Sequence, residues 1–312
     1  MPAIVVSIGQ IILLFSLIFY ASSVIQAVVY KGVLSKLIKL TSNWRNLSSS
    51  MYLLYALVPV FIATLATVIL FNPNLIPNLI TPHCHAQNCQ PHTIVSSNTH
   101  APVDYLIVFI TAIVVTVAVL MLRQIKLAKT YFKTLDSFAK NSLQGYKIIQ
   151  SDQAIAWCAG LLKPQVFISN QLLNTLNQEQ LTLVLAHELS HKLHKDNLKK
   201  WLVSWLVKVW PSTIANKFYS QLNNTVEIEA DVRAIKQVEA SNLELYQQTI
   251  ESFCQCSHNQ QRHLATSTQL QETNKGKAVF FSSASALIVA GYACVLVLYF
   301  PKILHPIIEW LS

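Results

Sequence analysis

The segment LAHELSHKLHKD, residues 185–196, holds side chains whose types and spacing suit metal chemistry. Its core has the H-E-x-x-H pattern, with His187 and His191 four residues apart. On a helix these two imidazoles lie one turn apart and project from one face toward a shared metal ion. Glu188 is rotated by about 100° from its neighbour, so it can reach a water molecule at the metal without binding the metal itself. The pattern predicts a zinc site with His187 and His191 as ligands and Glu188 as the catalytic base.

A catalytic zinc site usually needs a third protein ligand and an open position. The segment TVEIEAD, residues 225–231, offers Glu227, and Asp231 follows one helical turn later. This is the only Glu in the chain with an Asp four residues after it. We expect Glu227 to bind the metal and Asp231 to accept a hydrogen bond from the free ring nitrogen of a ligand histidine. The other interpretations are a solvated helix with two stray histidines and a pseudoenzyme that binds zinc without cleaving.

These side chains need a scaffold, and the flanking sequence predicts an α+β domain. The segments 146–151, 154–159 and 165–169 are short, rich in β-branched or aromatic residues and separated by turn residues, which indicates a small sheet. Asn177 with Gln180 three residues later is typical of a helix N-cap box. Apolar residues then recur at helical spacing through the metal-binding segment, at Leu181, Val184, Leu185, Leu189 and Leu193.

The remainder of the chain is dominated by long apolar runs. Of its 312 residues, 53% are hydrophobic and only 12% are charged, and the mean hydropathy is +0.41. Four runs reach the roughly 18–20 apolar residues that cross a bilayer as a helix. We therefore predict a multi-pass α-helical membrane protein with four transmembrane helices, at residues 1–30, 51–71, 105–122 and 278–300.

The basic residues of the connecting segments predict the orientation, because loops rich in Lys and Arg stay in the cytoplasm. Loop 31–50 is basic, loop 72–104 has no Lys or Arg, and segment 123–277 is basic at both ends. We therefore expect a bacterial inner-membrane protein with its N-terminus, loop 72–104 and tail 301–312 outside. The peptidase domain, 123–277, would be cytoplasmic. The formal charge of +9 then reflects topology and attraction to the lipid bilayer, and no direct nucleic acid binding is expected.

The stretch from Gly160 to Asn197, followed by an apolar helix, "WP" and "EIEAD", resembles the BlaR/MecR-type antirepressor metallopeptidases, which are membrane gluzincins. The resemblance covers residues 160–235 and the layout of three spans, a cytoplasmic protease and a fourth span. It implies a zincin-like fold, Zn²⁺ as cofactor and signal transduction by proteolysis. The implied substrate is a cytoplasmic protein, a winged-helix repressor of the BlaI/MecI/CopY type. Asp196 also falls on a family position, for which we expect only a structural role.

Two features separate this chain from other metallopeptidases. The β-lactam receptors of the antirepressor family carry a penicillin-binding sensor domain after the fourth span, whereas only twelve residues follow Phe300 here. We therefore expect a different stimulus. The HtpX-type quality-control proteases share HExxH and ExxAD, but in them the protease follows two spans and the N-terminus is cytoplasmic. A third alternative is a metal receptor with an inert protease core.

Loop 72–104 is the largest segment predicted to lie outside, and it is rich in soft or borderline ligands. Cys84, His85, Cys89 and His92 suit zinc or copper. The same cysteines could instead form a Cys84–Cys89 disulfide in an oxidising compartment, or act as a free-thiol redox sensor. The loop is thus a candidate sensor whose chemistry the sequence leaves open.

Two further segments have alternative interpretations. Residues 199–211 carry three tryptophans beside three lysines, which is typical of a helix at the inner membrane interface. A core helix under the active site fits the same pattern. Tyr219 or His263 could donate a hydrogen bond to the oxyanion of peptide hydrolysis.

Overall fold

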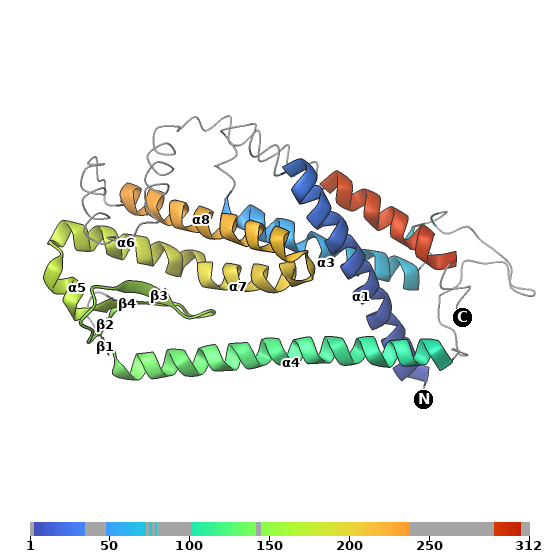
Figure 1. Cartoon of the computed structure of the whole chain (residues 1–312), viewed down its shortest axis with the longest axis horizontal. Helices are drawn as coiled ribbons and strands as arrows, with labels where there is room; N and C mark the ends of the chain where they lie inside the picture. Colours follow the sequence, from blue (N-terminus) through green and yellow to red (C-terminus); the bar gives the residue numbers. More distant parts are fainter. Residues whose placement is uncertain are drawn as a thin grey trace, which may run out of the picture.

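The computed structural model describes residues 3–34, 48–72, 75–76, 79, 101–141, 145–237 and 290–306. In Figure 1 a small sheet lies at one end of the molecule and the N-terminal helix at the other, and the long helix of residues 101–138 runs along one side between them. In chain order the first helices are α1 (Ala3–Val29), its π-helical continuation η1 (Tyr30–Leu34), α3 (Ser49–Phe71) and α4 (Ala101–Phe138).

Helices α1, α3 and α4 coincide with the first three predicted spans. The segments Ile8–Gly32, Ser49–Phe71 and Tyr105–Phe138 are each long and apolar enough to cross a membrane. Helix α4 continues 16 residues past residue 122, where the predicted span ends. This extension contains no Gly or Pro, and it includes three Lys and two Leu, which favour a helix. The membrane helix therefore runs without a break into the segment that leads to the sheet.

The fourth predicted span, 278–300, lies only partly within the described residues. Residues 290–306 form a helix, which lies beside α1 in Figure 1. Tyr292, Leu296 and Phe300 pack against the apolar cluster formed by α1 and α3. Residues 278–289 fall outside the described part of the chain.

The sheet confirms the three predicted strands and adds a short one. The strands are β1 (Lys140–Asn141), β2 (Lys147–Ile149), β3 (Ala156–Ala159) and β4 (Gln165–Ser169), in the spatial order β1-β2-β4-β3. Strands β2 and β4 are parallel, and the other pairs are antiparallel. Strand β4 is the most buried strand, and its Val166 and Ile168 pack with Leu181 of the next long helix.

The remaining helices are α5 (Asn170–Thr175), α6 (Gln178–His194), α7 (Asp196–Leu206), the 3-10 turn η4 (Val207–Val209) and α8 (Ser212–Gln237). The predicted capping box is present, because Asn177 and Gln180 bond to each other's backbone N–H. Helix α6 ends at Lys195, whose φ of 50° is left-handed. Such a backbone costs a non-glycine residue about 1–3 kcal/mol unless its surroundings compensate. The turn starts α7 at once, so that Asp196 faces back toward α6.

An aromatic cluster joins α8 and Trp210, the residue after η4, to the first two membrane helices. Phe218 of α8 is 1% exposed. Its ring lies 5.0 Å from that of Tyr30, 5.2 Å from Tyr52 and 5.1 Å from Trp210, measured between centroids. Tyr30 is the first residue of η1, directly after α1, and Tyr52 lies in the first turn of α3. The ends of both membrane helices are therefore part of the hydrophobic core of the helical domain.

Candidate metal centre

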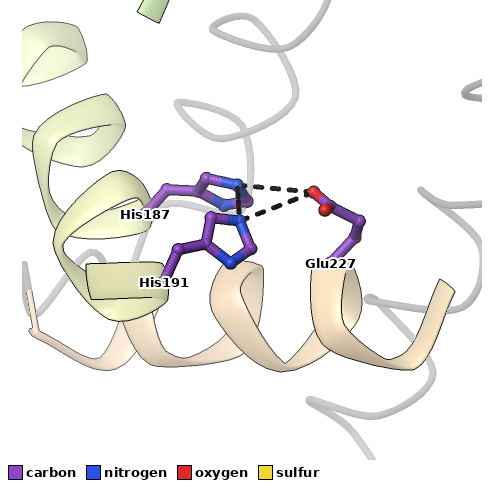
Figure 2. A group of neighbouring side chains, drawn as sticks. All are labelled: His187, His191 and Glu227. Atoms are coloured by element: carbon purple, nitrogen blue, oxygen red, sulfur yellow. Dashed lines mark hydrogen bonds and ion pairs between the residues drawn. The ribbon is translucent and has the colours of Figure 1, made fainter. Parts of the chain in front are cut away.

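Three side chains from two helices converge on one point. Figure 2 shows His187 and His191 projecting from α6 toward Glu227 on α8. One ligand atom from each residue lies within 4.8 Å of the other two. The Glu227 Oε2 atom is 3.6 Å from the Nε2 atom of each histidine. The structure thus brings together the three residues predicted as metal ligands, as the only such group within the described ranges.

Each histidine is oriented by a carboxylate behind it. His187 Nδ1 is 2.8 Å from Asp231 Oδ1, and His191 Nδ1 is 2.9 Å from Asp196 Oδ2. Both aspartates are buried. A proton on each Nδ1, donated to its carboxylate, leaves both Nε2 lone pairs directed at the shared point. The contact of Asp231 is the one expected from the sequence.

The third ligand is also held from behind. Lys200 Nζ lies 3.1 Å from Glu227 Oε1, so this lysine engages one carboxylate oxygen while Oε2 faces the histidines. Lys199 Nζ lies 3.0 Å from Asp196 Oδ1. The two adjacent lysines of α7 therefore support the site at different points, one at Glu227 and one behind His191.

Burial and charge shift the protonation equilibria of this centre. Burial lowers the pKa of His187, but hydrogen bonds to Asp231 and Glu227 outweigh it and raise this pKa to about 9. Burial raises the pKa of Glu227, yet the hydrogen bonds to His187 and His191 hold it well below its usual range. Without a metal, a proton is thus favoured among the three ligands. Metal binding there requires its release.

Glu188 lies on the side of α6 that faces the sheet. Its carboxylate accepts a hydrogen bond from the backbone of Cys158 in β3. Burial raises the pKa of Glu188, against the opposing effect of the two ligand histidines. A carboxylate whose pKa is moved toward neutrality is better suited to accept a proton and pass it on.

The structure assigns a contact to one residue whose role was not recognised in the sequence. Asp196 was expected to be structural, but it orients His191 through a direct hydrogen bond. The feature of the sequence that could have indicated this contact is the position of Asp196, five residues after His191 and at the start of the next helix. That signal is weak on its own, because only the left-handed turn at Lys195 brings the carboxylate back to the ring.

The remaining predictions concern the tryptophan-rich segment 199–211, the oxyanion candidates Tyr219 and His263, and the sensor loop. The tryptophans of α7 contact α4: the indole N–H groups of Trp201 and Trp205 both donate to Gln124 Oε1. Tyr219 packs against the aromatic cluster. The candidate sensor residues Cys84, His85, Cys89 and His92 lie outside the described residues, as does His263.

Comparison with known proteins bears on the segment that contains this centre. Residues 122–254 match the family model of peptidase family M48. This M48 segment includes every residue of the metal centre described above. The match supports a metallopeptidase domain attached to the apolar helices, and so a membrane metallopeptidase. No curated protein and no solved structure matches the chain.

The donor set of the M48 segment fits zinc. Two imidazole nitrogens and one carboxylate oxygen are a usual set of three protein ligands at a catalytic zinc ion, where a fourth position stays open. The aspartates behind both histidines supply the outer hydrogen bonds that such ligands almost always make. We therefore take zinc as the metal that this centre would hold.

Proposed function

We propose that this chain is an integral-membrane zinc endopeptidase. The observation that carries the proposal is the convergence of His187, His191 and Glu227, with Glu188 beside them, inside the M48 segment. A buried aspartate lies against the Nδ1 atom of each histidine. Two stray histidines on a solvated helix would not require such partners.

The proposed chemistry is the hydrolysis of a peptide bond. When bound, zinc would lower the pKa of a water molecule to about 7 and polarise the peptide carbonyl. Glu188 would accept the proton of the attacking water and deliver it to the leaving amine. Asp231 and Asp196 would keep the two imidazole rings aimed at the metal. Lys200 would hold Oε1 of Glu227, so that Oε2 faces the two histidines.

We further propose that the substrate is a cytoplasmic protein, by resemblance a BlaI/MecI/CopY-like repressor, cleaved in response to an outside stimulus. Three apolar helices precede the sheet, which matches the layout of the antirepressor peptidases rather than the two preceding spans of the HtpX type. The ends of α1 and α3 are built into the core of the peptidase domain. This arrangement supports a role in which membrane helices influence proteolysis.

The first test is a pair of substitutions in the purified full-length protein. Glu188→Gln removes the base and leaves all three ligands, so it should retain zinc while kcat falls by about 10²–10⁴-fold. His187→Ala should lose both zinc and turnover. Elemental analysis and a peptide-cleavage assay measure the two effects. Wild-type turnover in Glu188→Gln would contradict the mechanism.

The second test identifies the substrate. The Glu188→Gln protein should hold its substrate without cleaving it, so cross-linking in cells followed by mass spectrometry reports the captured partner. A DNA-binding repressor supports the signalling role. A broad set of misfolded membrane proteins would instead support a quality-control protease, and normal signalling by the inactive variant would support a receptor with an inert core.

A further inference from the structure

Ser49 links the first turn of membrane helix α3 to the metal centre, although 138 positions separate it from His187 in the sequence. Its side chain is 1% exposed. The backbone N–H of Ser49 donates to Glu229 Oε1 at 2.9 Å, and its hydroxyl donates to Glu229 Oε2 at 2.7 Å. Both oxygens of this carboxylate are thus bound by one residue. Glu229 lies on α8 between the metal-ligand candidate Glu227 and Asp231.

The same hydroxyl has a second partner, which leads to a ligand histidine. Lys199 Nζ donates to Ser49 Oγ at 3.2 Å and to Asp196 Oδ1 at 3.0 Å. The other oxygen of Asp196 accepts the hydrogen bond of His191 Nδ1. A continuous chain of hydrogen bonds therefore runs from α3 to His191.

Glu229 extends the connection to α6. Arg233 donates to Glu229 Oε2 at 3.0 Å and to the hydroxyl of Ser190 at 3.3 Å. Ser190 precedes His191 and is itself buried. Ser49 thus stands where two hydrogen-bonded paths meet, one reaching the ring of His191 and the other reaching the helix that carries it.

We propose that Ser49 is a positioning residue of the metal centre, which fixes Lys199 and Glu229 and through them the orientation of His191 and the placement of α8. The inference rests on the proposed zinc-peptidase function and adds to it a residue from a membrane helix. A serine hydroxyl can donate one hydrogen bond and accept others. Here the hydroxyl donates to Glu229, and its oxygen accepts a hydrogen bond from Lys199. Alanine would remove both interactions in a buried setting, where lost partners are costly.

The chain offers matched variants for the test. Ser50 is the next residue on α3 and is exposed, so Ser50→Ala controls for the loss of a hydroxyl in the same turn. Ser49→Thr keeps the hydroxyl. Zinc affinity is measured by chelator competition on the full-length protein in detergent, and kcat and KM are measured with a peptide substrate.

We expect Ser49→Ala to lower zinc affinity by about tenfold, the lower end of the range for residues that orient metal ligands. It should lower kcat and leave KM unchanged. Ser49→Thr should restore most of the affinity, and Ser50→Ala should match the wild type. Equal zinc affinity and kcat in Ser49→Ala and Ser50→Ala would overturn the inference. Failure of the wild type to bind zinc or cleave peptides would instead overturn the proposed function.

A double-mutant cycle separates positioning from general destabilisation. If Ser49 acts through Lys199, the effects of Ser49→Ala and Lys199→Ala on zinc affinity should be clearly less than additive in the double variant. Additive effects would contradict the path. If Ser49→Ala does not fold, Glu229→Gln weakens the same link from the other side, and an unchanged zinc affinity in that variant would also overturn the inference.

Discussion

At the scale of single residues, the two carboxylates behind the histidines determine how well the centre is formed. Asp231 comes from α8 and Asp196 from the start of α7, yet each lies within 3 Å of the Nδ1 atom of its histidine. Burial raises the pKa of Asp196, but hydrogen bonds from His191 and Lys199 keep it below its usual range. The carboxylate therefore stays charged and able to orient the ring.

This arrangement predicts a loss of zinc affinity when either carboxylate is neutralised. Asp196→Asn and Asp231→Asn keep the size of the side chain and remove its charge, and each should weaken zinc binding by about 10–100-fold. Asp152→Asn, at an exposed position, is the matched control. Chelator competition measures the affinities. Control-like binding in both variants would show that the aspartates do not orient the ligands.

The sequence reveals residues of the centre when their spacing along one helix is sufficient. His187, Glu188 and His191 share α6, and Glu227 and Asp231 share α8, so helical periodicity alone groups them. Lys200, Ser49 and the hydrogen bond of Asp196 depend on how α3, α7 and α8 pack together. No local pattern encodes that packing, and these contacts therefore required the structure.

At the scale of elements, the sequence likewise predicts what depends on local composition and misses what depends on packing between distant segments. The three longer strands and the capped helix α6 follow from local composition and were predicted. The order β1-β2-β4-β3, the two-residue strand β1 and the continuation of α4 to Phe138 were not. Strand order depends on contacts between segments far apart in the chain. The end of a membrane span was inferred from charge, although charged residues do not end a helix.

The packing of α8 on the membrane helices predicts that Phe218 is important for stability. Phe218→Ala removes a fully buried ring that contacts Tyr30 of η1, Tyr52 of α3 and Trp210, and such a change costs about 3–5 kcal/mol. The thermal unfolding midpoint should fall well below that of Phe138→Ala, which truncates a phenylalanine that is 77% exposed. Equal midpoints for the two variants would show that α8 and the membrane helices are not one cooperative unit.

At the scale of the whole molecule, the contacts of α1 and α3 with the peptidase domain bear on how the chain would sit in a membrane. The end of α1 and the start of α3 flank loop 31–50, and both meet the peptidase domain: Tyr30 donates a hydrogen bond to Gln221, and Ser49 bonds to Glu229. The topology prediction requires this, because it assigns the loop and the domain to the same side of the membrane. The prediction that this side is the cytoplasm rests on the basic residues alone.

Reporter fusions test the sidedness. A reporter that is active only outside the cytoplasm should be active after Gln90, in the loop without Lys or Arg, and inactive after Gln260, in the segment with basic ends. A cytoplasm-specific reporter at the same two positions should give the opposite pattern and controls for expression. Activity of the first reporter only after Gln260 would place the peptidase domain outside and exclude a cytoplasmic repressor as its substrate.

The final prediction is that the segment between α3 and α4 senses a soft metal ion, copper or zinc. It carries Cys84, His85, Cys89 and His92, which are ligands suited to these ions. One end of α3 leads into this segment, and its other end holds Ser49 against Lys199 and Glu229. A metal that favours one placement of α3 over another by a few kcal/mol would shift the same equilibrium at the catalytic centre.

The test replaces all four residues together, the cysteines with Ser and the histidines with Ala, and follows substrate cleavage in cells titrated with copper, zinc and an oxidant. We expect the response to metal to disappear while cleavage by the purified protein with added zinc persists, because the catalytic ligands are untouched. A wild-type response to metal would refute the sensor. If the fourfold variant loses the response to oxidant and keeps the response to metal, the result would indicate the Cys84–Cys89 disulfide. Only the disulfide depends on oxidation of the thiols.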